Sequence, residues 1–128
     1  MPSLNVDARS SSEVSFFVFQ KGFLLLKLHW LDMKVRLSTK VLDHIVARHP
    51  EVRAYAREIV EAVRGPDLVV KGLKGELKAL RFYSALSIGS KYLVVVYREF
   101  DDEKVIITAY FTSNVARVKG EVVWRKLR

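Results

Sequence analysis

Segments with the composition of β-strands fill the second half of the chain, and they constrain the fold more than any other feature of the sequence. Residues 91–100 and 104–112 are rich in valine, isoleucine and tyrosine, which favour pleated, half-buried strands. The links between these segments are short, and consecutive strands joined by short links pair antiparallel. We therefore predict a four-strand antiparallel meander and a further strand near the end of the chain: residues 67–71, 76–84, 91–100, 104–112 and 121–126.

Two helices are expected before this sheet. Ser38 or Thr39 can cap the first helix, because a side-chain hydroxyl accepts a hydrogen bond from a free helix amide. His49 precedes a proline, and the proline ring disfavours helical backbone at the residue before it, so the first helix should end there. Pro50 is well placed to open a second helix, which should cover residues 51–64 and end at the following Gly-Pro pair.

Two helices followed by an antiparallel sheet predict an α+β fold, with the helices packed on one face of a four-stranded or slightly larger sheet. We assign residues 33–128 to this domain and residues 1–32 to an N-terminal extension. Residues 1–13 should be loose, and two apolar runs around Lys21-Gly22 predict a β-hairpin. Three interpretations of the extension stay open: an accessory hairpin, a strand that forms a homodimer through residues 14–31, or a segment outside the core fold.

The chain is strongly basic. It carries 22 lysines and arginines against 14 acidic residues, a formal net charge of +8. Residues 1–32 are neutral in sum, so the whole excess lies in the predicted domain, and residues 117–128 are its most basic stretch. Such a charge points to an anionic partner, most simply RNA, although a membrane surface or an acidic protein would also serve. The basic end is either a solvated tail or a strip that faces phosphates.

Several function classes are disfavoured. The chain has no cysteine, which excludes disulfides and thiol nucleophiles. Its three histidines have no metalloprotease spacing, and its glycine pairs lack the following helix that a phosphate loop needs, so we expect no metal and no cofactor. Polar and charged residues interrupt the most apolar early stretch, residues 14–31, which is therefore no membrane span, and no signal-peptide pattern is present. We therefore expect a cytoplasmic protein that makes no membrane contact.

The remaining polar residues suit metal-free cleavage of RNA. RNA carries its own nucleophile, the 2′-hydroxyl, so an enzyme needs only a base, an acid and cations for the charge that builds on the phosphorus. Histidine titrates near neutrality, and arginine offers a fixed fork to phosphate. The candidates that meet these needs are His44, Arg48, His49, Tyr83, Arg98, Tyr110, Thr112 and Ser113.

Each candidate also has a purely structural interpretation. His44 and Arg48 lie four residues apart at the edge of the first helix's apolar face, where a side chain can reach a cleft. His49 could cap or pack that helix. Arg98 could be a surface side chain at the end of an apolar stripe, and the hydroxyls that follow Phe111 could simply end a strand.

The order of several runs resembles small phage- and toxin-associated proteins of the barnase–EndoU–colicin–RelE-like nuclease group. The resemblance covers about residues 33–126 and rests on residues 44–52 (HIVARHPEV), 66–67 (PD), 81–83 (RFY), 91–98 (KYLVVVYR), 107–113 (ITAYFTS) and 119–124 (KGEVVW). It implies helices on a four-stranded antiparallel sheet and metal-independent RNA cleavage, often by the toxin of a toxin–antitoxin pair.

The resemblance also implies roles for individual residues. His44 would be the acid or base carried by a helix, Arg98 would contact the phosphate, and Thr112 and Ser113 would be the hydroxyls that end the late strand. The remaining expected RNA contacts are Arg48, His49, Tyr83, Tyr110 and Lys119. We expect these catalytic side chains to converge on one electropositive hollow.

Two functions from different classes stay open. The first is a metal-independent endoribonuclease, with an antitoxin protein as partner if the chain is a toxin. The second is a noncatalytic RNA- or protein-binding module of the same architecture, because basic charge and tyrosines support binding without turnover. Self-association through the N-terminal hairpin is a third, weaker interpretation.

Overall fold

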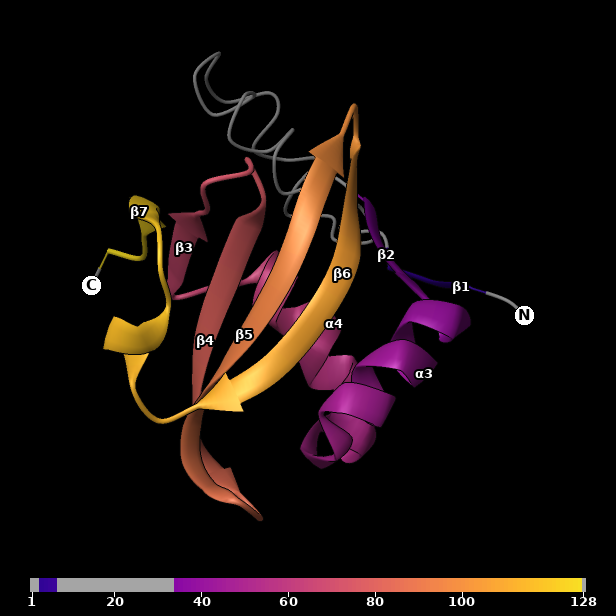
Figure 1. Ribbon diagram of the computed structural model, residues 1–128, viewed down its shortest axis with the longest axis vertical. Coiled ribbons are helices and arrows are strands. Elements are labelled where there is room, and N and C mark those ends of the chain that lie inside the picture. The colour runs from indigo at the N-terminus through magenta and orange to yellow at the C-terminus, as the bar shows by residue number, and fades with distance from the viewer. Residues whose placement is uncertain (1–2, 7–33, 128) are drawn as a thin grey trace, which may run out of the picture.

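The computed structural model describes residues 3–6 and 34–127, which form one seven-stranded sheet with two α-helices against one of its faces (Figure 1). The strands run in the spatial order β1-β2-β6-β5-β4-β3-β7. Their bounds are β1 (Ser3–Val6), β2 (Lys34–Ser38), β3 (Leu68–Lys71), β4 (Leu77–Leu86), β5 (Gly89–Phe100), β6 (Glu103–Thr112) and β7 (Glu121–Arg125).

The first helix begins and ends as its sequence predicts. α3 (Thr39–Arg48) is capped by Ser38, whose Oγ accepts a hydrogen bond from the amide of Val41 at 3.1 Å. His49 follows with non-helical backbone, φ −134° and ψ 75°, because Pro50 disfavours the helical conformation at the residue before it. Pro50 then opens a 3₁₀ turn, η2 (Pro50–Tyr55), in place of the first part of the predicted second helix.

The second α-helix is shorter than predicted. α4 (Ala56–Arg64) buries one face, Ile59, Val60, Ala62 and Val63, and Gly65 ends it. Together, α3, η2 and α4 cover the rear face of the sheet in the view of Figure 1, and the core lies between them and the central strands. That core includes Ile45, Val52, Ile59, Leu93, Val95, Tyr97 and Ile106.

The α+β class is confirmed, and so is the antiparallel pairing of β3, β4, β5 and β6. The sheet is nevertheless larger than four strands, and it is mixed: β2 pairs parallel to β6 through Lys34–Arg36 and Glu103–Val105. Parallel pairing needs a long crossover, which the helical segment between β2 and the meander supplies. The purely antiparallel sheet of the prediction is therefore wrong at one ladder.

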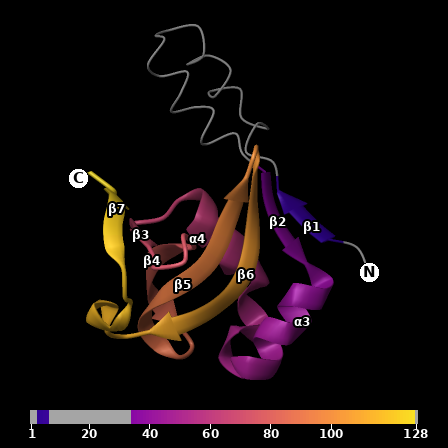
Figure 2. The same cartoon turned by 45° about the horizontal axis from the view of Figure 1, so that its top comes forward.

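The two ends of the described chain extend opposite edges of the sheet. β1 pairs antiparallel with β2, so part of the segment expected to be loose is a strand. β7 pairs antiparallel with β3 at the other edge (Figure 2). The predicted hairpin around Lys21-Gly22, and with it the homodimer through residues 14–31, lies outside the described residues. None of the helices that the structure describes is long and apolar enough to cross a membrane.

The front face of the sheet is only partly covered. Leu68, Val70, Leu80 and Val94 form a small second cluster there. Residues from the segment after β6, which contains the 3₁₀ turn η3 (Val115–Arg117), pack against this cluster, as do Tyr92 and Tyr110. Tyrosine and threonine side chains of β5 and β6 therefore reach the surface on the side away from the helices.

Candidate functional site

A shallow hollow of about 510 Å³ lies between the C-terminal end of α3 and the middle of β6. β2 pairs with only the first residues of β6, so beyond Val105 no described strand lies beside its outer edge, and α3 packs there instead. The hollow forms at this change of neighbour. It is lined by His44, Arg48, His49, Ile107, Thr108 and Tyr110.

Helix geometry places His44 and Arg48 at the hollow together. They are separated by four residues, and such residues share one face of an α-helix. Both side chains are exposed. Among the described residues, none forms an ion pair with Arg48, so its guanidinium can meet an external anion.

His49 reaches the hollow through the end of the helix. Its backbone N–H donates to the carbonyl of Ile45 at 2.7 Å, which completes the last helical turn. Its ring lies 5.7 Å from the ring of Tyr110, centroid to centroid, and the two planes are tilted by 36°. On the other side, its Nδ1 lies 3.8 Å from Oε2 of Glu51. The imidazole is thus held between a phenol and a carboxylate while its side chain remains 36% exposed.

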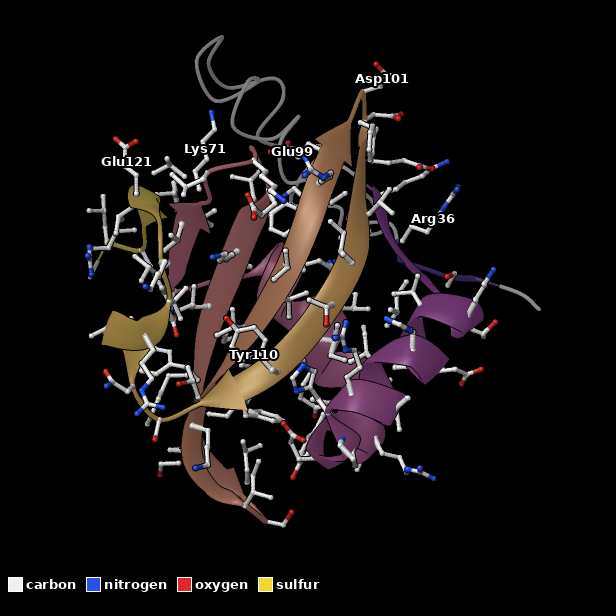
Figure 3. The ribbon with its side chains drawn as sticks, in the orientation of Figure 1. Arg36, Lys71, Glu99, Asp101, Tyr110 and Glu121 are labelled. Atoms are coloured by element: carbon white, nitrogen blue, oxygen red, sulfur yellow. The ribbon has the colours of Figure 1, made fainter. Side chains whose placement is uncertain are left out.

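A β-bulge in β6 shapes the strand side of the hollow. Between the pairs Val96–Thr108 and Tyr97–Ile106, β6 contains one extra residue, Ile107. Bulges bend a strand and redirect its side chains, and they recur beside active sites. Tyr110 lies over the front of the sheet (Figure 3). Partial burial raises the pKa of Tyr110, so its hydroxyl stays a hydrogen-bond donor at neutral pH.

Arg98 does not line this hollow. It lies on β5, and its guanidinium donates to the carbonyl oxygen of Lys74 at 3.1 Å, in the turn between β3 and β4. That turn is on the opposite side of β5 from β6. The expected convergence of His44 with Arg98 is therefore absent from the described structure, and Arg48 is the arginine that the fold brings to the histidines.

The two hydroxyls at the end of β6 are placed outside the hollow as well. Oγ1 of Thr112 accepts a hydrogen bond from the amide of Asn114 at 3.1 Å and donates to its carbonyl at 3.2 Å. Ser113 is exposed in the bend that follows. This arrangement matches the interpretation in which these residues end the strand.

Tyr83 and Lys119 are also remote. The hydroxyl of Tyr83 donates to Oε1 of Glu61 at 3.0 Å on the helix side of the sheet, and burial with this carboxylate raises its pKa. The carbonyl of Lys119 accepts from Nζ of Lys78 at 2.7 Å, ahead of β7. Of the nine predicted site residues, the fold brings four together: His44, Arg48, His49 and Tyr110.

Sequence reasoning missed three residues of this region. Ile107 and Thr108 line the hollow because of the bulge, and nothing in an alternating strand sequence announces one. Glu51 lies beside His49 only because a 3₁₀ turn follows Pro50. No group of three or more histidines and carboxylates within the described residues lies close enough to hold a metal ion.

The chain matches no protein-family model, no curated protein and no solved structure. Its function must therefore be argued from the site itself.

Proposed function

We propose that this protein is a metal-independent endoribonuclease whose active site is the hollow between α3 and β6. The observation that carries the proposal is the meeting of two imidazoles, one guanidinium and one phenol around one cavity. These are the groups that cleavage by an internal 2′-hydroxyl requires. The resemblance to the barnase–EndoU–colicin–RelE-like group supports the same function. It also implies that the protein is the toxin of a toxin–antitoxin pair.

The geometry suggests a division of roles. His49 is the general base, because Glu51 stabilises the imidazolium that forms when the ring takes the proton of the 2′-hydroxyl. The 2′-oxygen then bonds to phosphorus as the bond to the 5′-oxygen breaks. His44 protonates the departing 5′-oxygen, which leaves a 2′,3′-cyclic phosphate and a 5′-hydroxyl.

Arg48 and Tyr110 stabilise the charged intermediate. The phosphorane carries one more negative charge than the phosphodiester, and donors held in fixed positions around it stabilise this charge better than water that must reorient. The guanidinium of Arg48 supplies a cationic fork, and the phenol of Tyr110 supplies a neutral donor because its raised pKa keeps it protonated.

Incubation of purified protein with RNA in excess EDTA tests the proposal. Wild type should cleave, and His44→Ala and His49→Ala should each cleave at least about 100-fold more slowly, the usual contribution of one acid or base. Circular dichroism should show both variants folded, since neither side chain is in the buried core. Intact RNA with wild type, or equal rates for wild type and both variants, would reject the mechanism.

A noncatalytic RNA-binding module is the second candidate. It is favoured by exposed aromatic rings on the sheet, Phe82 at 45% and Trp124 at 37% exposure, because such rings bind bases without any chemistry. It predicts salt-sensitive binding with full recovery of intact RNA. The EDTA experiment therefore distinguishes the two candidates directly.

A further inference from the structure

A second cluster of cationic and aromatic side chains lies at the opposite edge of the sheet from α3. It surrounds two hollows, of about 600 Å³ and 440 Å³, which share the residues Asp67, Phe82 and Lys126. The first hollow also has Leu68, Tyr92, Val115 and Arg125 in its lining. The second has Arg64, Gly65, Pro66, Arg81 and Trp124.

The aromatic rings at this edge are partly exposed to solvent. Phe82 is 45% exposed although it lies within β4, because β3 ends opposite Leu80 and leaves the next part of β4 uncovered. Tyr92 pairs directly with it across the β4–β5 ladder, and their ring centroids are 5.1 Å apart. Trp124 of β7 also lines the second hollow, but it pairs with Val69, whose partner on β4 is Ala79 of the helix-side core.

Most of the charged side chains around these rings are cationic. Arg64, Arg125 and Lys126 line the two hollows, as does Arg81, whose guanidinium donates to the carbonyl of Gly65 at 3.3 Å and lies 5.5 Å from the ring centroid of Tyr83. The single carboxylate, that of Asp67, accepts a hydrogen bond from the backbone amide of Phe82 at 2.8 Å. The carboxylate of Asp67 therefore helps to hold β4 in place. Flat rings between cations suit a ligand with alternating bases and phosphates.

We infer that this edge, the Phe82 surface, is an accessory binding site for single-stranded RNA. One base stacks on Phe82 and Tyr92, while neighbouring phosphates meet Arg64, Arg125 and Lys126. Stacked bases and phosphates alternate along a single strand of RNA, so this ligand matches the rings and the cations together. This inference rests on the proposed function for the identity of the ligand, and it concerns affinity rather than the chemical step.

The Phe82 surface and the catalytic hollow lie within reach of one short strand of RNA. Tyr92 and Tyr110 pack against the same apolar cluster on the front face. Strand spacing and rise place the Cα atoms of Phe82 and Tyr110 roughly 12 Å apart, across two ladders and two residues along the strands. A substrate of a few nucleotides can therefore occupy both sites.

The test measures binding apart from cleavage. Fluorescence anisotropy with an octanucleotide RNA is performed on the full chain carrying His44→Ala and His49→Ala, to which Phe82→Ala is added. The added change should weaken binding about tenfold, the usual contribution of one stacked base. Phe100→Ala is the matched control, since Phe100 is 55% exposed at the far tip of β5 and should not change the affinity.

An abasic oligonucleotide of the same length separates stacking from charge. It should bind more weakly than RNA to the parent protein and equally to the parent and to Phe82→Ala. Equal affinity of the parent for both ligands, or equal effects of Phe82→Ala and Phe100→Ala, would overturn the inference. Phe82→Leu retains apolar bulk and should reproduce the loss in a folded protein. This experiment measures binding and not cleavage, so it tests the Phe82 surface even if the protein proves to have no ribonuclease activity.

Discussion

At the scale of single residues, position in the fold decides which polar groups can act together. Arg48 and Arg98 are the same residue type, and the family resemblance implied that the second contacts the phosphate. Arg98 is held by a carbonyl in the β3–β4 turn, whereas Arg48 shares a helix face with His44. In the proposed mechanism a guanidinium beside the two imidazoles would stabilise charge on the phosphorane, whereas Arg98 lies across β5 from the hollow and cannot reach it.

Replacement of Arg48 tests this assignment. Arg48→Ala should lower kcat for RNA cleavage about 100-fold or more, because removal of one donor to the transition state has an effect of this size. Arg57→Ala removes the same charge from an exposed position on α4, outside the hollow, and should leave kcat unchanged. If both variants lose activity equally, net charge rather than the hollow controls the rate.

Lys104 makes stability depend on pH. It is only 2% exposed, and its Nζ lies 5.6 Å from the ring centroid of Tyr97. Burial lowers the pKa of Lys104 from 10.5 to about 8. Between these values the unfolded chain binds more protons than the folded chain, so the free energy of unfolding rises with pH. Above about pH 10 the rise should reverse, because burial raises the pKa of Tyr97, Tyr83 and Tyr110 above the unfolded value.

Urea unfolding at pH 7, 8, 9 and 10 measures this dependence. We expect the free energy of unfolding to increase by about 1 kcal/mol from pH 8 to pH 9, where Lys104 titrates and the tyrosines contribute little. Lys104→Met should remove most of the increase. An increase of the same size in the variant would show that another group is responsible.

At the scale of elements, local sequence patterns predict where helices and strands lie, but they do not predict which distant strands pair. α3 and the meander strands follow from capping, from Pro50 and from β-rich runs with short links. The β2–β6 ladder joins residues about seventy positions apart, and no local pattern encodes it. Because that ladder stops at Val105 and leaves the rest of β6 to α3, the hollow itself depends on a feature that the sequence does not reveal.

The same limit applies to the site residues. Helical spacing predicts that His44 and Arg48 lie on one face of the first helix. The position of His49 before Pro50 predicts that it lies at the end of that helix. Their meeting with Tyr110 depends on the bulge at Ile107 and on how α3 packs against β6. Thr112 and Ser113 were predicted as site residues because they carry hydroxyls. In the structure Thr112 hydrogen-bonds to Asn114 in the turn after β6, and Ser113 is exposed in the same bend.

β7 depends on the glycine that precedes it. Gly120 has a φ of +137°, and a Cβ there would collide with the carbonyl oxygen of Lys71 on β3. Gly120→Ala should therefore weaken the β3–β7 ladder and displace Trp124 and Arg125 from the Phe82 surface.

Hydrogen exchange and RNA binding should both report this change. Amides of β7 should exchange faster in Gly120→Ala while those of β5 stay protected. RNA affinity should fall as it does in Phe82→Ala. Gly89→Ala is the control for a strained glycine, because its φ is also positive but a Cβ there meets nothing within 4 Å. Undiminished protection of β7 in Gly120→Ala would contradict the prediction.

At the scale of the whole molecule, the helices cover one face of the sheet (Figure 1), and Tyr92 and Tyr110 lie on the other face. In the proposed function, the formal charge of +8 would attract RNA to the protein without regard to sequence. The Phe82 surface would retain the strand, and the hollow would act on it. Affinity and catalysis would thus be assigned to different parts of one small sheet.

The most direct test of this account compares two oligonucleotides of one sequence in excess EDTA, one of RNA and one with deoxyribose throughout. Because the attacking group belongs to the substrate, wild type should cut the RNA and produce ends with a 2′,3′-cyclic phosphate and a 5′-hydroxyl, and it should leave the deoxyribose strand intact. The double variant His44→Ala/His49→Ala should cut neither. Cleavage of both oligonucleotides by wild type, or of neither, would contradict the account.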